Sequence, residues 1–467
     1  MNRIMIIKSI IATLVFSCSF GSLMAQDNIK SLPAIPHEKN GFHAYYTRLN
    51  YTKEWEKPWR VGKFADVVVT FPNSEAGFVF WRGASYIPNW VTENGIWYNN
   101  QFIERISSGI KETKGCVEPM SDKQCRYSQV RIIEDNEARK VIHWRYAPVD
   151  VQYHHPYVDP ENGWYDWVDE YYVIYPDATS VREATLYSTE VNAFADWQES
   201  IIVHQPGRSP ENDIDSTAVS ISNVKGETTN YYWPEASKKM SLRGLPEKAC
   251  IQVVNLKSQL KPFIVVPPDP GLTVRLFTSH GTHSIFHQWD HWPVSQDKSD
   301  GREAKDDSNP SHTSLTYWKG WKPISTTANS TTFVMLAGMT IKKAGELNGI
   351  AKSWLSPATV KVEASSSLTF NGFNQSEKAY TFTDQNTDKS KKAIFEVNAN
   401  SENPLVNPSF VIHDWKGTKA KIKIKGTNQR VEEMKQGMEY GMNGNTLVVW
   451  IKAEITVPIQ VSISPDK

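Results

Sequence analysis

Residues 141–146 read Val-Ile-His-Trp-Arg-Tyr, and residues 170–175 read Glu-Tyr-Tyr-Val-Ile-Tyr. Both runs combine β-branched and aromatic side chains, which favour β-strands. A third run of this kind covers 181–187, after the turn-like sequence Pro-Asp-Ala-Thr at 176–179. The runs predict strands, the last two joined as a hairpin over 171–187.

Similar runs recur along the chain without helical spacers between them. They cover 67–70, 78–81 and 251–254, and they end at turn signals such as Pro206-Gly207. Strands that follow one another directly pair most simply as antiparallel neighbours. The predicted fold class is therefore all-β.

The large N-terminal part, residues 26–339, is predicted to be one β-domain that carries the active site. We expect a large antiparallel β-supersandwich. A seven-bladed β-propeller is the alternative, because seven blades of roughly 45 residues would also fill this length. No repeat of that period is visible in the sequence.

The sequence pattern changes twice in the remaining part of the chain, residues 340–467. Apolar residues recur at helical spacing from Ile341 to Ala351, Thr340 could cap this helix, and Pro357 follows it. Residues 340–357 are thus predicted as a helical connector. Beyond it, residues 358–467 contain short alternating strands such as Ala-Lys-Ile-Lys-Ile-Lys at 420–425, typical of a C-terminal β-sandwich.

The N-terminus is typical of a secretory signal. Arg3 and Lys8 precede an apolar run over 10–20 that is too short to span a membrane, and Leu-Met-Ala at 23–25 resembles a cleavage site. A signal peptide over 1–25 predicts a secreted or periplasmic protein. The alternative is a lipid anchor at the cell surface through Cys18.

The charge balance and the cysteines limit the possible partners and bonds. Lysine plus arginine equals aspartate plus glutamate, 51 each, which argues against nucleic-acid binding. No later stretch is apolar enough to predict a membrane span. Export permits disulfides, so Cys116 and Cys125 could pair, although three separate thiols including Cys250 would fit equally.

Alternation along strands suggests a site. His143 and Arg145 share one face of their strand, Tyr172 lies on the next strand, and Arg182 lies on the return strand. If these strands are neighbours, the four could converge and support β-elimination of a uronic-acid glycan. Arginine or histidine would offset the carboxylate charge, while tyrosine or histidine would move protons. Buried polar pairs are the structural alternative.

We therefore take His143 and Tyr172 as the candidate acid/base pair, with Arg82, Arg145 and Arg182 as candidate anion binders. Hydrolysis would instead need a pair of carboxylates. The candidates for it are Asp169, Glu170, Glu199 and Asp290.

Aromatic and histidine-rich segments complete the predicted site. His280, His283, His287 and His291 fall within a dozen residues. We predict a substrate-binding loop in which His291 reaches the cleft while Trp289 and Asp290 contact substrate. Metal binding by His287 and His291 would need a helix, so no metal site is assigned.

Two further residues, Trp81 and His154, are candidate substrate contacts, and Gly83 could orient a third. Trp81 could stack on a sugar ring, and Gly83 permits a bend that aims Arg82 into a cleft. His154 lies in the aromatic stretch 116–182, which holds three of the twelve histidines. Ordinary aromatic packing is the alternative for Trp81.

No cofactor is required by this scheme. Calcium could bind the oxygen-rich segment 159–163 together with Asp166, although the full ligand pattern of a calcium loop is missing. The sequence has no P-loop and no GxGxxG, HExxH or GxSxG motif, so nucleotide-binding, zinc-protease and serine-hydrolase functions lack support.

Five segments together resemble large secreted proteins of polysaccharide-degrading bacteria, of the polysaccharide lyase or glycoside hydrolase type. They are Trp81–Tyr86, His143–Tyr146, Glu170–Tyr172, Asp290–Pro293 and Asn407–Ile412. The resemblance implies a role in polysaccharide degradation and transfers no catalytic residue.

The sequence thus predicts an exported carbohydrate-active enzyme that cleaves an acidic, uronate-containing polysaccharide or oligosaccharide by β-elimination. A glycoside hydrolase with a carboxylate pair is the first alternative. A non-catalytic glycan-binding protein of the cell surface is the second.

Overall fold

The computed structural model describes most of the chain beyond the N-terminal segment. The described residues are 31–36, 41–49, 64–100, 102–105, 113, 116–122, 124–150, 152–208, 210–232, 244–276, 278–279, 282–286, 311–442 and 444–466. The predicted signal peptide over 1–25, Cys18, Trp289, Asp290 and His291 lie outside them. Within these ranges, no helix is both long enough and apolar enough to cross a membrane.

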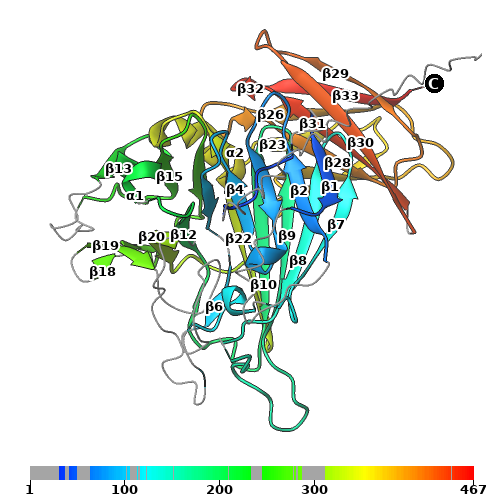
Figure 1. Cartoon of the computed structure of the whole chain (residues 1–467). Helices are drawn as coiled ribbons and strands as arrows, with labels where there is room; N and C mark the ends of the chain where they lie inside the picture. Colours follow the sequence, from blue (N-terminus) through cyan, green and yellow to red (C-terminus); the bar gives the residue numbers. More distant parts are fainter. Residues whose placement is uncertain are drawn as a thin grey trace, which may run out of the picture.

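Two ten-stranded antiparallel sheets form the N-terminal part (Figure 1). Sheet I contains β1 (His43–Thr47), β2 (Asp66–Thr70), β3 (Gly77–Phe80), β4 (Pro88–Val91), β5 (Trp97–Asn99), β12 (Glu199–His204), β17 (Thr273–Leu276), β18 (Thr278–Ser279), β19 (Thr282–Phe286) and β20 (Ser311–Lys319). Sheet II contains β7 (Gln129–Asp135), β8 (Lys140–Tyr146), β9 (Trp167–Ile174), β10 (Thr179–Tyr187), β13 (Ile214–Ser222), β14 (Thr228–Tyr232), β15 (Ile251–Leu256), β16 (Lys261–Val265), β21 (Ser325–Thr326) and β22 (Ser330–Thr340).

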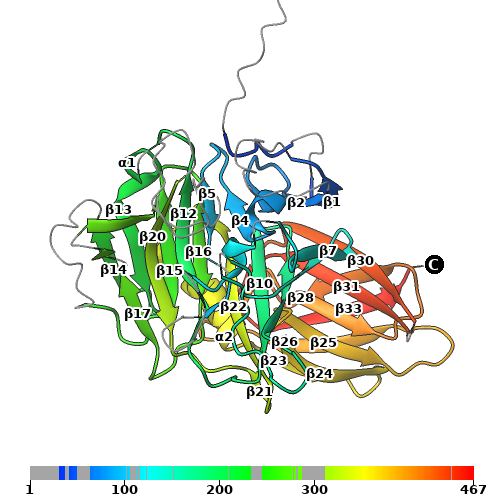
Figure 2. The same cartoon turned by 60° about the horizontal axis from the view of Figure 1, so that its bottom comes forward.

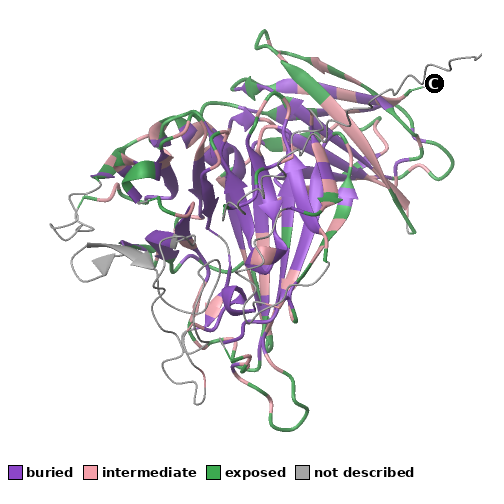
Figure 3. Ribbon diagram, viewed as in Figure 1, coloured by how far each residue is buried: buried purple, intermediate pink, exposed green. Residues whose placement is uncertain are grey.

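The two sheets pack face to face around one large hydrophobic core. Phe78 and Phe80 of sheet I each place their rings 5.5 Å from the ring of Tyr172 in sheet II. A polar contact also crosses the gap, because Gln252 of β15 donates to Ser200 of β12 at 2.7 Å. The predicted all-β sandwich is confirmed, and burial follows the facing strands (Figure 3).

The propeller alternative does not describe this architecture. Blades of a propeller are four-stranded sheets built from consecutive strands, whereas both sheets here have ten strands. Sheet I combines β1–β5 with β12 and β17–β20, which come from distant parts of the chain. Such long-range pairing leaves no local repeat, in agreement with the absence of one in the sequence.

A second, smaller sandwich follows (Figure 2). Its sheets are β23 (Thr359–Val362), β26 (Ala393–Asn398), β33 (Ile459–Pro465) and β29 (Ala420–Lys425), and β24 (Leu368–Asn374), β25 (Ala379–Asp384), β28 (Ser409–His413), β31 (Gly444–Lys452) and β30 (Glu433–Gly441). It has its own hydrophobic core. β25 and β28 pair in parallel, although the other pairings within these two sheets are antiparallel.

The helical segment between the sandwiches begins later than predicted. β22 extends to Thr340, and the helical turns are η5 (Ala344–Leu347) and α2 (Asn348–Leu355). Thr340 therefore caps no helix. The side chain of Glu346 accepts a hydrogen bond from the Lys343 backbone N–H at 2.7 Å instead. Ile341, predicted on the apolar face, is 69% exposed because it precedes the first helical turn.

A buried ion pair lies inside the larger sandwich. Arg182 of β10 donates to both carboxylate oxygens of Glu170 on β9, at 2.8 and 2.5 Å. Tyr146 donates to the same carboxylate at 2.8 Å, and Tyr172 donates to its other oxygen. All four side chains are buried, so this closed network satisfies its charges internally.

The network also holds a distant segment in place. Arg182 donates from Nη1 to the backbone carbonyl of Trp197 at 2.5 Å. Tyr146 accepts a hydrogen bond from the backbone N–H of Ile103 at 2.7 Å. These two contacts reach the chain just before β12 and just before β6 (Glu104–Arg105), so the interior of the sandwich positions both segments.

Replacing Glu170 by Gln should destabilise the protein strongly. The change removes the buried counter-charge of Arg182 and should lower the free energy of unfolding by about 3–5 kcal/mol, measured by urea denaturation. Glu183→Gln is the matched control on β10, where the side chain is only half-buried, and we expect a change under about 0.5 kcal/mol. Equal effects of the two substitutions would contradict the role of the network.

Candidate functional site

The predicted acid/base pair does not form. In the β8–β9 pairing, His143 lies opposite Tyr171, whereas Tyr172 lies opposite Ile142. Side chains alternate along a strand, so this register puts His143 and Arg145 on the outer face of sheet II. Tyr172 and Arg182 point into the core, together with Glu170. The four residues predicted to converge are therefore divided between two faces.

The chemical environments also oppose the predicted roles. Burial and the Glu170 carboxylate raise the pKa of Tyr172 well above its usual value, which keeps it a neutral hydroxyl donor. His143 uses both ring nitrogens, because Nε2 lies 2.6 Å from Asp169 and Nδ1 lies 2.8 Å from Arg131. Both ring nitrogens of His143 are thus engaged by neighbours, and the Tyr172 hydroxyl is buried in the core.

Arg145 and Asp169 belong to the same outer cluster. Arg145 donates to Asp169 at 2.8 Å and lies 4.9 Å from the centre of the Trp167 ring. Burial raises the pKa of Asp169, but hydrogen bonds from His143 and Arg145 outweigh burial and hold this pKa below its usual value. Asp169 is thus a fixed counter-ion for its two neighbours.

Trp81 and Arg82 are structural residues. Trp81 is fully buried, with its ring edge-on to Trp97 at 5.7 Å, so it offers no surface to a sugar. Arg82 is buried as well. It pairs with Asp66 and donates to the carbonyl of Leu49 at 2.9 Å, which directs it into the fold and away from any cleft.

His154 and the proposed calcium segment lie near the surface. His154 bonds to Asp150 at 2.9 Å, and its side chain is about half exposed. Asp159 accepts hydrogen bonds from Glu161 and Asn162 within its own loop. Asp166 points elsewhere, because its carboxylate accepts a bond from Arg105 at 2.6 Å, and this divides the proposed calcium ligands.

Cys116 and Cys125 form no disulfide. Cys125 is buried beside the η2 turn (Arg82–Ala84) and donates to the carbonyl of Arg82 at 3.2 Å. Cys116 instead faces Glu104, and the two thiols have unrelated surroundings. Of the two arrangements that the sequence left open, the structure has separate thiols.

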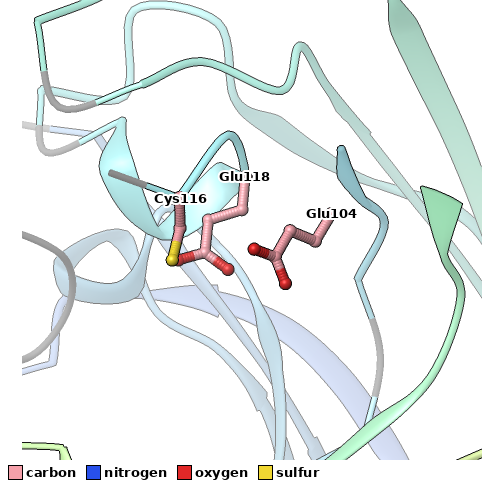
Figure 4. A group of neighbouring side chains, drawn as sticks. All are labelled: Glu104, Cys116 and Glu118. Atoms are coloured by element: carbon pink, nitrogen blue, oxygen red, sulfur yellow. The ribbon is translucent and has the colours of Figure 1, made fainter. Parts of the chain in front are cut away.

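A cluster of acidic side chains gathers where two short strands meet. β6 pairs with β11 (Ala195–Asp196), which sets Glu104 directly opposite Asp196. Glu199 begins β12 and accepts a hydrogen bond from Ser314. We call Glu104, Glu118, Asp196 and Glu199 the carboxylate cluster. Figure 4 shows Glu104 pointing toward Cys116 and Glu118.

Buried contacts hold the chain on either side of this cluster, at β6 and just before β12. Arg105, the neighbour of Glu104, is fully buried and bonds to Asp166 and to Ser188 at 2.9 Å. Gln198, the neighbour of Glu199, accepts from the backbone N–H of Trp318 at 2.9 Å. Like charges directly opposite each other are unfavourable in a sheet, so these contacts must oppose the repulsion between the carboxylates.

Three carboxyl groups of the cluster have raised pKa values. Burial, followed by repulsion from Asp196, raises the pKa of Glu104 to about 7. Burial and then Glu104 raise the pKa of Glu199 to about 8. Burial raises the pKa of Asp196 to about 6, against the lowering effect of Lys319 and Arg275. Perturbed values in one place are typical of functional sites.

Cationic and aromatic groups flank the cluster. Arg275, Tyr317 and Glu199 occupy one cross-strand row of sheet I. Lys319 lies 5.7 Å from the ring centre of Phe194 and 5.6 Å from that of Tyr317. The site therefore combines proton donors, carboxylates, cations and aromatic rings within a few strands.

A metal ion is one possible occupant of part of the cluster. One ligand atom each from Glu104, Cys116 and Glu118 lies within 4.8 Å of the others. Two carboxylates and a thiolate would suit zinc better than calcium, which takes oxygen ligands. Burial and the nearby glutamates raise the pKa of Cys116 well above its usual value, so the thiol is neutral unless a cation binds.

Only Glu199 of this cluster was among the residues predicted from sequence. Glu104 and Asp196 lie in two-residue strands, which leave no periodic pattern. A weak signal existed in Cys-Val-Glu at 116–118, since alternation in an extended segment puts Cys116 and Glu118 on one side.

No family model and no curated protein matches the chain. Among solved structures, a galactose 1-epimerase from Lactobacillus acidophilus NCFM has a TM-score of 0.26 and 6% identity, covering 60% of this chain and 99% of its own. A heparinase III has a TM-score of 0.25 and 7% identity, covering 71% and 39%. A polysaccharide lyase has a TM-score of 0.19 and 10% identity, covering 90% and 43%.

Likeness at these TM-scores assigns no function. The matched regions span about two fifths of the heparinase III and of the polysaccharide lyase. The function has to be judged on the residues of this chain.

Glu199→Gln should stabilise the protein at high pH. Glu199 and Glu104 bind protons more tightly in the folded chain than at their ordinary pKa of 4.5. Stability therefore falls as pH rises from about 4.5 to about 8. The variant should melt higher than the wild type at about pH 9 and similarly at about pH 4, by differential scanning fluorimetry.

Glu396→Gln is the control, since Glu396 is exposed on β26 in the C-terminal sandwich. It should leave the pH dependence of melting unchanged. If Glu199→Gln shifted the melting temperature equally at both pH values, the raised pKa of Glu199 would be refuted.

Proposed function

We propose that this chain is a carbohydrate-active enzyme that cleaves glycosidic bonds at the carboxylate cluster by acid-assisted hydrolysis. One observation carries the proposal. Glu104, Asp196 and Glu199 share a half-buried site and have pKa values of about 7, 6 and 8. Two carboxyl groups with different pKa values are the requirement for glycoside hydrolysis.

Each group has a distinct role in this proposal. Glu199 stays protonated at neutral pH and gives its proton to the glycosidic oxygen as the bond to the anomeric carbon breaks. Asp196 is ionised and takes a proton from a water molecule, whose oxygen bonds to the anomeric carbon. Lys319 and Arg275 lower the pKa of Asp196 against the effect of burial and so favour its charged form.

Glu104 interacts electrostatically with both Asp196 and Glu199. After burial, the charge of Glu104 is the largest cause that raises the pKa of Glu199. The charge of Asp196 in turn raises the pKa of Glu104. An ionised Glu104 therefore keeps the proton on Glu199. Phe194, which is 45% exposed beside Lys319, supplies an apolar face on which a sugar ring can stack.

β-Elimination from a uronate-containing glycan is the second candidate function. Arg275 and Lys319 adjoin Tyr317, with Arg275 Nη1 3.5 Å from the Tyr317 hydroxyl. These cations would offset the carboxylate charge of a uronate, and Tyr317 would take the C5 proton. This set replaces His143 and Tyr172, which lie on opposite faces of sheet II.

Turnover of a polysaccharide panel tests the proposal. Purified protein is incubated with neutral and acidic polysaccharides, and reducing ends are measured together with the ultraviolet absorbance of unsaturated uronates. We expect reducing ends without that absorbance. Glu199→Gln and Asp196→Asn should each lower kcat at least about 100-fold, whereas Glu396→Gln should keep full activity.

The pH profile adds a second readout. Activity should fall below about pH 6 as Asp196 gains a proton and above about pH 8 as Glu199 loses one. New absorbance with reducing ends would favour β-elimination at Tyr317. Full activity of both carboxylate variants, or binding of glycans with no new ends, would contradict an enzyme that uses this cluster.

A further inference from the structure

A cavity lies where β9 begins and β10 ends in sheet II, next to the loop over residues 159–165. Its volume is about 380 Å³. It is lined by Asp159, Asn162, Trp164, Tyr165, Tyr187, Ser188, Thr189 and Asn329. The lining thus combines three aromatic rings with carboxylate, amide and hydroxyl groups.

The loop that carries Trp164 is fixed by its own hydrogen bonds. Asp159 accepts from the Glu161 backbone N–H at 2.8 Å and from the Asn162 side chain at 2.9 Å. Asn162 accepts in turn from the Trp164 N–H at 2.8 Å. Gly163 has a φ of 76°, which glycine adopts without strain. The loop is therefore organised before any ligand binds.

Two large rings that line the cavity are exposed to solvent, Trp164 in this loop and Tyr187 at the end of β10. Trp164 is 59% exposed and Tyr187 is 40% exposed. Exposed apolar surface of this size, held by a rigid turn, has no role in the packing of the sandwich and commonly marks a binding site. Trp164, Tyr187 and Asn329 all line the cavity, so it offers an indole N–H, a phenol hydroxyl and an amide to a ligand.

The aromatic surface continues beyond the cavity. Tyr165 stacks on His155 at 3.6 Å and on Trp167 at 5.6 Å. Tyr187 lies opposite Trp167 across the β9–β10 pair, and Arg145 covers the Trp167 ring. These aromatic side chains therefore form a row that extends from the cavity along the outer face of sheet II.

We propose that this cavity is a saccharide-binding site separate from the carboxylate cluster. Sugar rings present apolar faces that stack on aromatic side chains, and their equatorial hydroxyls pair with amides, carboxylates and hydroxyls. Trp164 and Tyr187 would stack on the ring, while Asn329 and Thr189 would bond its hydroxyl groups. The proposal does not depend on cleavage at the carboxylate cluster.

The fold links the two sites through one short strand. Arg105 of β6 bonds to Ser188, which lines the cavity, and to Asp166, the neighbour of Tyr165. The residue before Arg105 on β6, Glu104, points toward Cys116 and Glu118 in the carboxylate cluster. β6 therefore supports both the cavity, through Arg105, and the carboxylate cluster, through Glu104.

Affinity electrophoresis tests the site. The full chain is run in native gels that contain hydroxyethylcellulose, glucomannan, polygalacturonate or alginate. We expect at least one gel to retard the wild type, and Trp164→Ala or Tyr187→Ala to weaken that binding at least about tenfold. Tyr440→Ala is the control, since Tyr440 is 68% exposed on β30 in the C-terminal sandwich.

The outcome is separable from the hydrolysis proposal. Glu199→Gln should keep wild-type retardation even if it abolishes turnover, and Trp164→Ala should keep its melting temperature because its side chain is exposed. Wild-type retardation of both Trp164→Ala and Tyr187→Ala would overturn the site. So would a wild-type protein that none of the four gels retards.

Discussion

The buried ion pair between Glu170 and Arg182 is the interaction on which the rest of this structure depends. Two charges removed from water need full compensation, and Tyr146, Tyr172 and the Trp197 carbonyl provide it. The same contacts fix the chain immediately before β12 and β6. The sandwich core therefore determines where Asp196, Glu199 and Glu104 can lie, although none of these three belongs to the core.

This arrangement explains how acidic side chains can be held together at a cost in stability. Burial and mutual repulsion raise the pKa values of Glu104 and Glu199 above neutrality or close to it, which disfavours the folded state at high pH. Two buried neighbours of the cluster, Arg105 on β6 and Gln198 just before β12, are held by hydrogen bonds that oppose that repulsion. Carboxyl groups with shifted pKa values, held in place by buried neighbours, are typical of groups that transfer protons.

The sequence allowed the strands to be predicted better than the site. The hairpin of β9 and β10 and the alternation within β8 follow from local composition. Register does not, and Tyr171 rather than Tyr172 lies beside His143 because pairing depends on both strands at once. Glu104 and Asp196 sit in strands of two residues, where no periodicity can develop. Their proximity arises from contacts between residues far apart in the chain.

The proposed chemistry requires Glu199 to carry a proton at neutral pH within a cluster of ionisable carboxyl groups. Titration of ¹³C-labelled glutamate carboxyl groups by NMR tests it most directly. We expect one resonance that titrates at about 8 and that is missing from the spectrum of Glu199→Gln. A spectrum in which every glutamate titrates near about 4.3, the usual value for this side chain, would contradict it.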